Sequence, residues 1–491
     1  MKSRFYIITL LIIFGFTSCY EDKGNYNYDT LTTVKIEGIP DPCNAFSGTN
    51  LKIPVNITYE NGELTDVSYE WRVEGKVIST DKDLDILVNF ETKPGQYADF
   101  SVIDNKTGIR TIKTFTMNVT TEFSKGWLIL SDNIDHSELS FIRYDGELYQ
   151  NIYEKLNNEQ LSPGAVCIKE HWLPWSGVNG EIFIGIPNGP NYSVEIDGNS
   201  LMRMVYSKDE FLEGKPDNFA PVNFDAVMNW DYMISNKKLY TRYVRSGLDA
   251  KYHEGRFVRL PVPGTYELSN ITLRGNVVFS NDIIAFDNLS KSYKLIRNGE
   301  MDNFNYDNDP NKKFKPFNMG KTLLAGGAIS VATPTDNFIT ILKGDDNQYY
   351  VQKFKFSGWS NKSYTSLEEL IFPNPELITQ DTHWAICQNR PYVYFNSGNK
   401  LYAYNHTSNT IKELKGTTFK GNIRTIAINP TNYEELAIAV ENPEQTNKCD
   451  FMLLNVSVVE DGKIIEGSLK EDILGNITNI TYKVGSQWDI Q

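Results

Sequence analysis

The chain has 491 residues, with 48 Lys and Arg against 62 Asp and Glu, and a formal net charge of −14. Hydrophobic residues make up 40% and aromatic residues 13% of the chain, which excludes a disordered protein. The length predicts two to four ordinary domains, or one small domain and one large one, and the acidic balance excludes non-specific nucleic-acid binding, because acidic surfaces repel phosphates.

Residues 1–18 predict a secretory signal peptide. Lys2 and Arg4 precede an apolar stretch over 6–16. This stretch rises only about 16 Å as a helix, too short for a hydrocarbon core of ~30 Å. It ends in Phe16-Thr17-Ser18-Cys19, which resembles a bacterial lipobox with Phe16 in place of the commoner Leu. We expect cleavage before Cys19 and lipid attachment to its thiol; a plain signal peptide with an incidental Cys is the alternative.

The mature chain would run over 19–491 with a net charge of −16, since Lys2 and Arg4 are lost from the −14 of the whole chain. No later stretch approaches 18 uninterrupted apolar residues, so the acyl anchor is expected to be the only membrane attachment. Glu21 and Asp22 resemble the export signal that sends Bacteroidetes lipoproteins to the outer face of the outer membrane. The alternative is that these acidic residues only keep the segment solvated. In either case, residues 19–32 are predicted to be a lipidated flexible tether.

Residues 33–120 predict a small β domain. Short stretches with period-two alternation, such as 51–55, 67–73 and 97–102, follow one another without a helical segment, which is typical of an immunoglobulin-like sandwich. Trp71 is predicted to be buried on a central strand, and Pro94-Gly95-Gln96-Tyr97 to lead into a tyrosine corner. The Tyr-x-Trp strand followed by a late Tyr-containing strand resembles a PKD-like domain, without its usual Gly-Asp-Gly turn.

Residues 121–491 predict a β-propeller. Pairs of hairpin strands recur roughly every 45–55 residues, the spacing of propeller blades. The stretches 283–287 and 401–405 are the clearest blade strands. About seven blades are expected, with six or eight left open because WD-repeat and kelch signatures are missing.

Four further cysteines, Cys43, Cys167, Cys387 and Cys449, lie more than 60 residues apart. Two long-range disulfides and four isolated buried thiols both remain open. No CxxC pair exists, so redox chemistry is not expected.

Motifs for metal, nucleotide or nucleophilic chemistry are missing from the sequence. The five His residues are never within four positions of one another, so neither a metal site nor a cofactor is predicted. Residues 302–309 are rich in oxygen ligands, but they lack the Gly and Glu of an EF-hand and are expected to be a solvated loop. Asp132, Asp225 and Asp231 near strand ends are conceivable carboxylates for hydrolysis.

Aromatic clusters near predicted loops are the more suggestive feature. Trp172, Trp175, Trp230 and Trp384 are candidate ligand-binding residues, since their faces suit sugar rings or peptide side chains. Packing between blades is the alternative for each Trp.

The stretch 19–28, followed by the predicted sandwich, resembles the PKD-like lipoproteins of Bacteroidetes. That resemblance implies an accessory lipoprotein on the cell surface, beside a SusC-type TonB-dependent transporter and a SusD-type lipoprotein, which helps capture oligosaccharides or oligopeptides. It supplies no catalytic motif. A surface glycosidase or peptidase on a propeller scaffold, and a purely structural subunit of the transporter complex, are the alternatives.

Overall fold

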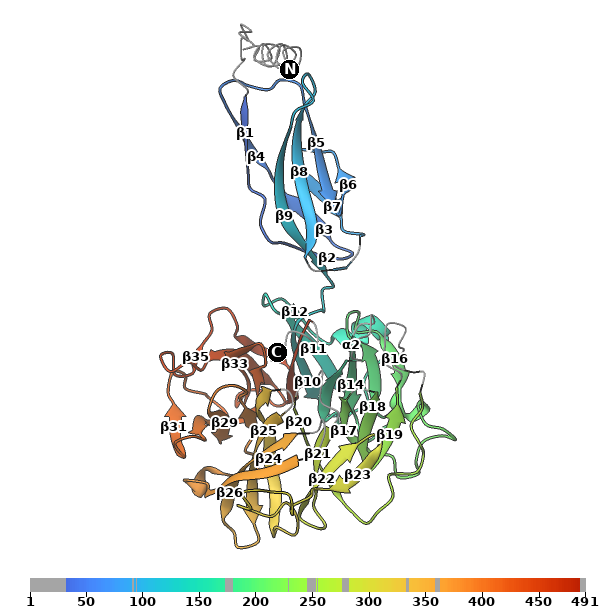
Figure 1. Ribbon diagram of the computed structural model, residues 1–491, viewed down its shortest axis with the longest axis vertical. Coiled ribbons are helices and arrows are strands. Elements are labelled where there is room, and N and C mark those ends of the chain that lie inside the picture. Colours follow the sequence, from blue (N-terminus) through green and yellow to red (C-terminus); the bar gives the residue numbers. More distant parts are fainter. Residues whose placement is uncertain are drawn as a thin grey trace, which may run out of the picture. The chain divides into compact units, whose positions relative to one another are not determined.

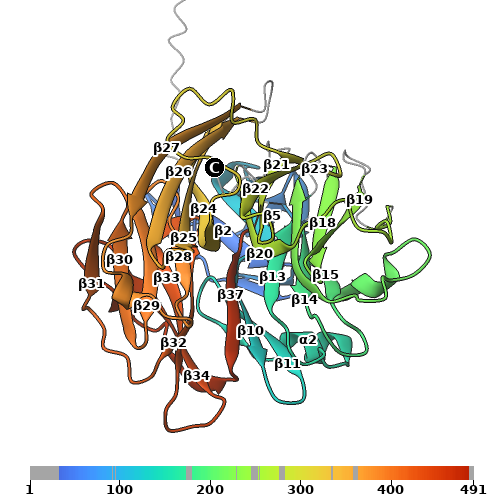
Figure 2. The same ribbon diagram turned by 90° about the horizontal axis from the view of Figure 1, so that it is seen from below.

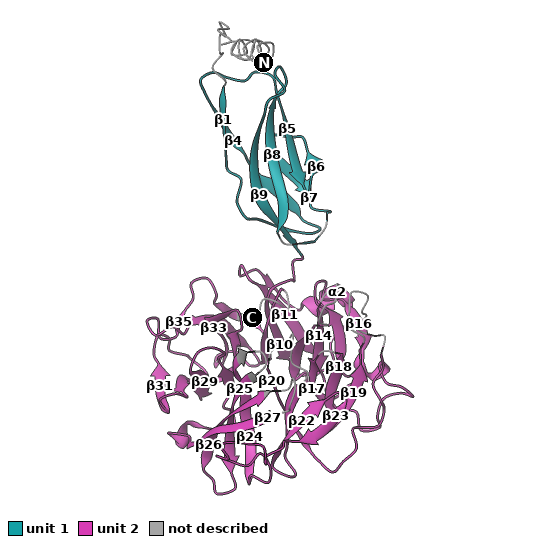
Figure 3. Cartoon of the chain, viewed as in Figure 1, with its two compact units in different colours: residues 1–120 teal, residues 121–491 magenta. Residues whose placement is uncertain are grey.

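The structure is a computed structural model that describes residues 32–485 except 91, 94, 173–179, 228, 245–252, 254, 276–281, 333–334 and 358–362. The predicted signal peptide, Cys19, Glu21, Asp22 and Trp175 lie outside the described residues. The chain divides into two compact units, one up to Thr120 and one from Thr121 onward (Figure 3). The described elements are strands, one short α-helix and two 3-10 turns, so the all-β prediction is confirmed.

The first unit is a β-sandwich. Its larger sheet has the strand order β2-β9-β8-β5-β6, and two-stranded sheets β1-β4 and β3-β7 complete it (Figure 1). The strands are β1 (Thr33–Glu37), β2 (Cys43–Phe46), β3 (Asn50–Ile53), β4 (Asn56–Glu60), β5 (Val67–Val73), β6 (Lys76–Ser79), β7 (Leu84–Leu87), β8 (Gln96–Asp104) and β9 (Arg110–Thr120). Strand β2 pairs with β9 in parallel, and the other pairs are antiparallel.

Trp71 lies at the centre of the sandwich core, as the sequence predicts. It is fully buried, its ring lies 4.5 Å from that of Phe100, and its indole nitrogen donates to the Asp81 carbonyl. The tyrosine-corner prediction was wrong, because 54% of Tyr97 is exposed. Side chains alternate along a strand, so with Ala98 and Phe100 pointing into the core, the side chain of Tyr97 points out.

In the described residues the second unit is a β-propeller of seven sheets, which we number as blades 1 to 7. Blade 1 contains β10 (Gly126–Asp132), β11 (Ser137–Arg143), β12 (Leu148–Tyr149) and β37 (Ile477–Lys483). Blade 2 contains β13 (Cys167–His171), β14 (Glu181–Gly185), β15 (Val194–Asp197) and β16 (Arg203–Tyr206). Blade 3 contains β17 (Pro221–Val227), β18 (Trp230–Ser235) and β19 (Lys238–Tyr243). Helix α2 (Ile152–Asn157) and the turns η1 (Ser207–Asp209) and η3 (Pro375–Leu377) lie between strands.

Blades 4 to 7 complete the propeller. Blade 4 contains β20 (Leu268–Arg274), β21 (Asp282–Asp287), β22 (Ser292–Arg297) and β23 (Glu300–Asn303), and blade 5 contains β24 (Lys321–Ala332), β25 (Thr335–Gly344), β26 (Tyr349–Ser357) and β27 (Ser363–Ile371). Blade 6 contains β28 (Trp384–Ile386), β29 (Tyr392–Ser397), β30 (Lys400–Asn405) and β31 (Thr410–Leu414). Blade 7 contains β32 (Ile423–Asn429), β33 (Asn432–Glu441), β34 (Cys449–Asn455), β35 (Lys463–Ile464) and β36 (Lys470–Leu474).

The C-terminal strand β37 closes the ring. It pairs with β10, so the first blade is built from both ends of the propeller sequence. The innermost strands then follow one another around the centre in the order β37, β13, β17, β20, β24, β28 and β32, and β32 lies beside β37 (Figure 2). Each of these strands is the edge strand of its own sheet, and the arrangement around a common centre protects these short edges.

Both faces of each blade are covered by neighbouring blades, which explains the nearly continuous apolar strands. Every residue of β14 and of β21 is buried. The cores between blades combine residues from successive sheets; between blades 1 and 2, for example, Leu128 and Leu139 pack in one cluster with Ile182 and Ile196. Large aromatic side chains fill several of these wedges.

The four cysteines of the described chain are buried free thiols, each in a different core. Burial raises the pKa of Cys43 and Cys167 to about 11, so these thiols are inert at neutral pH. No helix within the described ranges has the length and apolar character of a membrane span.

Candidate functional site

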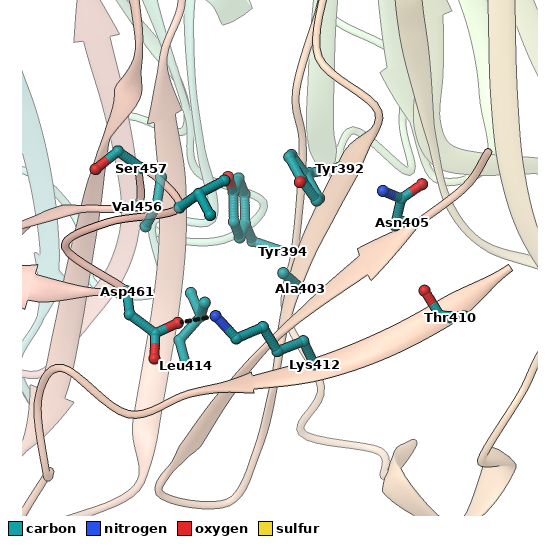
Figure 4. A pocket seen from close by; sticks show the side chains of 11 residues that line it. Tyr392, Tyr394, Ala403, Asn405, Thr410, Lys412, Leu414, Val456, Ser457 and Asp461 are labelled. Atoms are coloured by element: carbon teal, nitrogen blue, oxygen red, sulfur yellow. Dashed lines mark ion pairs between the residues drawn. The ribbon is translucent and has the colours of Figure 1, made fainter. Parts of the chain in front are cut away.

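A pocket of about 220 Å³ lies between blades 6 and 7 (Figure 4). Strands β29, β30 and β31 form one wall, and the turn that follows β34 forms the other. The lining residues are Tyr392, Tyr394, Ala403, Asn405, Thr410, Lys412, Leu414, Val456, Ser457, Val458 and Asp461. The volume suits one ring-sized group of a larger ligand, because sites that enclose a whole drug-sized molecule occupy about 300–1,000 Å³.

The strand register explains why this wall is hollow. Tyr394 lies opposite Ala403, which lies opposite Lys412, and the adjacent row joins Tyr392, Asn405 and Thr410. Because alternate residues of a strand share a face, both rows point toward blade 7. The small side chain of Ala403 stands between a tyrosine and a lysine and leaves the space between them open.

Polar groups and aromatic rings face this space together. Tyr394 is 1% exposed, and its hydroxyl makes no hydrogen bond to any described residue. Lys412 Nζ lies 2.7 Å from Asp461 Oδ1 across the pocket, and this ammonium lowers the pKa of Asp461 (Figure 4). Burial raises the pKa of Tyr394, so its hydroxyl stays protonated at neutral pH.

A second groove lies on the opposite face of blade 6, toward blade 5. Its volume is about 430 Å³, and Asn389, Arg390, Pro391 and His406 line it from blade 6. Burial and the nearby Lys353 lower the pKa of His406, so its imidazole is neutral. Arg390 lies over the ring of Tyr392, 5.5 Å from its centroid, and so connects this groove with the pocket.

The three described tryptophans of the sequence prediction are not brought together. Trp172 packs in the core between blades 1 and 7, below the Lys483 ammonium at 6.0 Å. Trp230 meets Tyr243 edge-on at 5.4 Å, and Trp384 stacks on Phe395 at 5.0 Å, on the side of blade 6 that faces blade 5. Each Trp is half-buried among blade residues, and none of the three lines the pocket between blades 6 and 7.

The three aspartates considered for hydrolysis also lie apart. Asp132 accepts hydrogen bonds from Ser137 and Gly164 in blade 1. Asp225 pairs with Arg274 toward blade 4, whereas Asp231 faces blade 2. In the oxygen-rich stretch, Asp309 is 2% exposed and accepts hydrogen bonds from Asn311 and Ser366, which ties this segment to β27.

Sequence reasoning missed a cluster of charged side chains between blades 2 and 3, buried except at Arg256 and His253. We call it the inter-blade cluster, and its members are His171, Glu181, Glu195, Glu210, Asp231, Arg242, His253 and Arg256. Arg242 lies at its centre and is fully buried. Its guanidinium is 3.1 Å from Glu195 Oε2, 2.6 Å from Glu210 Oε2 and 2.6 Å from Asp231 Oδ2. Glu181, Glu195 and His253 each place one ligand-type atom within 4.8 Å of the other two, so these residues could hold a metal ion.

The pKa values of three side chains in the cluster are strongly shifted. Burial alone raises the pKa of Glu181, but the adjoining His171 and His253 lower it to about 2. Burial raises the pKa of Glu195 to about 7 although Arg242 opposes this. Burial lowers the pKa of His253, but the carboxylates of Glu181 and Glu210 outweigh that effect and raise it to about 10.

One sequence signal could have pointed to this cluster. Glu195 stands between Val194 and Ile196 in a short apolar strand, and Glu181 begins another apolar strand. A carboxylate within a buried blade strand needs a partner, since an isolated buried charge is costly. The identity of that partner depends on contacts between residues up to 72 positions apart, such as Glu181 and His253, which no local pattern contains.

Comparison with known proteins identifies the N-terminal region. The sequence pattern of the PKD-like family matches residues 19–164, so this part of the chain carries a PKD-like domain. The match continues past the sandwich into β10, β11, β12 and α2 of blade 1. No curated protein matches the sequence.

Several solved structures resemble the chain at low identity. A quinonprotein alcohol dehydrogenase-like protein from Bacteroides thetaiotaomicron is 12% identical, with 91% of this chain and 97% of that chain covered and a TM-score of 0.45. Sqt1 from Saccharomyces cerevisiae is 7% identical, with 64% and 89% covered and a TM-score of 0.36. The WD40 domain of SCAP from fission yeast is 9% identical, with 65% and 77% covered and a TM-score of 0.30. The propeller assignment itself rests on the closed ring of seven sheets.

Proposed function

We propose that this protein is a lipid-anchored binding protein on the outer face of the outer membrane, and that it captures oligosaccharides for a SusC-type transporter and its SusD-type lipoprotein. The observation that carries the binding role is the pocket between blades 6 and 7, with its tyrosine wall and its buried Tyr394 hydroxyl. The lipobox at Cys19 and the acidic residues Glu21 and Asp22 support the location, and the PKD-like domain supports the setting.

The lining of the pocket favours a sugar over an apolar ligand. Tyrosine rings offer flat apolar faces, and the hydroxyl, amide, ammonium and carboxylate groups of Tyr394, Asn405, Lys412 and Asp461 offer donors and acceptors around them. A sugar ring presents apolar C–H faces and a rim of hydroxyls, which matches this arrangement. The neighbouring groove at His406 gives room for further units of an oligosaccharide that crosses the edge of blade 6.

Oligopeptides are the competing class of ligand. Binding measured against both glycan and peptide libraries distinguishes the two classes. The mature lipoprotein in detergent is screened against glycan and peptide arrays, and each hit is measured by calorimetry. We expect oligosaccharides among the hits. Tyr394→Phe should weaken their binding about tenfold, because a lost hydrogen bond typically costs up to about 1.4 kcal/mol. Tyr402→Phe is the matched control, because Tyr402 lies on the face of the same blade that is turned away from the pocket.

The partner part of the proposal has its own test. Purification of the native outer-membrane complex should bring down a SusC-type transporter and a SusD-type lipoprotein, and their consistent absence would contradict this part alone. Co-purification without any ligand binding by the isolated lipoprotein would instead indicate a purely structural subunit. Turnover of a glycan or peptide in the array would support the hydrolase alternative.

A further inference from the structure

The inter-blade cluster joins two blades that are distant in sequence. Glu181 and Glu195 come from β14 and β15 of blade 2. His253 precedes a segment that lies along the outer edge of blade 3, where the Val258 amide donates to the Thr241 carbonyl of β19. A group that bound all three side chains would therefore connect blade 2 with blade 3.

The two ring nitrogens of His253 face different carboxylates: Nε2 lies 2.9 Å from Glu181 Oε1, whereas Nδ1 faces Glu210 and lies 3.9 Å from Glu195 Oε2. Nδ1 lies 2.9 Å from Glu210 Oε2, and Glu210 is itself held by Arg242 at 2.6 Å and by Arg256 at 3.2 Å. A carboxylate fixed in this way accepts the Nδ1 hydrogen, so a metal ion that displaces the Nε2 proton meets the lone pair of the imidazole on Nε2. Histidine ligands of metal ions commonly make this contact with a carboxylate through their second nitrogen.

Three ligand-type atoms of the cluster, His253 Nε2, Glu181 Oε1 and Glu195 Oε1, have no hydrogen bond to any described residue. His253 Nε2 and Glu181 Oε1 are 2.9 Å apart, yet this contact does not have the geometry of a hydrogen bond. Glu195 is fully buried, and its Oε1 has no hydrogen-bond partner among the described residues. Ligand atoms of a tetrahedral Zn²⁺ lie about 3.3–3.4 Å from one another at bond lengths of about 2.0–2.1 Å, so a small movement of these side chains brings them to coordination distance.

The carboxylates of the cluster outnumber its guanidinium groups. Four carboxylates, those of Glu181, Glu195, Glu210 and Asp231, are each at most 2% exposed at their side chains. Arg242 and Arg256 supply two positive charges to them. Once a metal ion displaces the Nε2 proton of His253, the four carboxylates exceed the two guanidinium groups by two negative charges, which equals the charge of one divalent cation. Buried charge without compensation is strongly unfavourable.

We propose that Glu181, Glu195 and His253 bind one divalent transition-metal ion of the Zn²⁺ type, which links blade 2 to blade 3. One imidazole nitrogen and two carboxylate oxygens suit Zn²⁺ better than Mg²⁺ or Ca²⁺, which prefer oxygen ligands alone. His253 is 23% exposed at its side chain, so solvent can supply the fourth ligand. Glu210 and Arg242 hold the ligands in place and do not touch the metal.

The test uses the mature lipoprotein in detergent, stripped with a chelator and titrated with Zn²⁺. We expect one Zn²⁺ per chain and a higher melting temperature. Glu181→Gln, Glu195→Gln and His253→Gln should each weaken Zn²⁺ binding by at least about 100-fold, and Glu210→Gln by about 10–100-fold. His136→Gln is the matched control, because His136 in blade 1 also contacts two carboxylates, Asp135 and Glu138, at 2.7 and 3.1 Å.

Each result either supports or overturns the proposal. No stoichiometric binding of Zn²⁺ would overturn it, as would binding that the three ligand variants leave intact. Because a variant could fail to fold, X-ray absorption of the Zn²⁺-loaded wild-type protein gives an independent answer. One imidazole nitrogen with carboxylate oxygens is expected, whereas sulfur ligands or a shell of oxygen alone would overturn the assignment.

Discussion

Blades 6 and 2 present the same pair of strands to the next blade around the ring, yet one interface holds an open pocket and the other holds the inter-blade cluster. In blade 6 an aromatic residue of the second strand, Tyr394, lies opposite Ala403 of the third. In blade 2 the corresponding pair is Phe183 and Glu195. At this position of the third strand, alanine leaves space in one interface, whereas a carboxylate joins the charged cluster in the other.

The two interfaces therefore differ in what stabilises them. The pocket leaves the Tyr394 hydroxyl without a partner among the described residues, and it contains an ion pair with 60% of the Lys412 side chain exposed. Ion pairs of that kind contribute little to stability, whereas a buried pair becomes strongly unfavourable once one partner is removed. The pocket is suited to binding and the cluster to holding two blades together.

The largest expected effect is that of Arg242→Met. This change leaves Glu195, Glu210 and Asp231 buried without their guanidinium, so the free energy of unfolding should fall by about 3–5 kcal/mol. Urea denaturation measures the change. Arg424→Met is the control, because Arg424 and Glu441 form an exposed pair at 3.0 Å that should be worth less than about 1 kcal/mol. Equal losses in the two variants would remove the contrast between buried and exposed pairs.

The second prediction concerns the pH dependence of the chelator-stripped protein. The pKa of His253 is raised to about 10, so its stabilising effect is complete below its unfolded pKa of about 6.5 and is lost as the pH rises through 10. The raised pKa of Glu195, about 7, also lowers stability as the pH rises from about 4.5 to 7. The lowered pKa of Glu181, about 2, acts on the acid side, where stability is lost as the pH falls from about 4.5 through 2.

The melting temperature should therefore be highest near pH 5 and fall by at least about 2 °C, the equivalent of about 1 kcal/mol, between pH 6.5 and 10. His253→Gln should flatten this part of the curve, as measured by circular dichroism at several pH values. A decline of the same size in His253→Gln would assign the effect to other groups.

A smaller change in stability is expected when either of two buried tyrosines, Tyr293 or Tyr394, loses its hydroxyl, and the two should differ. Tyr293→Phe removes a hydroxyl that lies 2.6 Å from Thr340 and donates to Gln352 at 2.9 Å, so about 1–3 kcal/mol should be lost. Tyr394→Phe removes a hydroxyl without a partner among the described residues and should be neutral or stabilising. Thermal unfolding of both variants makes the comparison, and a clear loss in Tyr394→Phe would mean that its hydroxyl is already bonded.

The smallest expected effect is that of Lys412→Met. The Lys412 side chain is 60% exposed and its partner Asp461 is 27% exposed, so the pair should add less than about 0.5 kcal/mol to stability. Ligand binding in the pocket should nevertheless weaken, since the ammonium faces the ligand space. A stability loss above about 1 kcal/mol, measured by urea denaturation, would make this pair a structural one and weaken its assignment to the ligand site.

Much of the fold could be predicted because it depends on local patterns. Period-two alternation located most strands, and their spacing predicted about seven blades, which matches the seven sheets of the described chain. The tyrosine corner failed because a one-residue difference in strand parity turns Tyr97 outward. The four candidate tryptophans stay predictions, with Trp175 outside the described residues and the other three among blade residues.

The sequence by itself determined the all-β class, the order of sandwich and propeller, and the burial of Trp71, since each follows from residue type and short-range spacing. Only the tertiary structure decided that Tyr394 and Asp461 face one pocket and that Glu181, Glu195 and His253 meet between two blades. Ring closure is the physical reason: stacking sheets around a common centre brings together side chains that strand patterns place independently of one another.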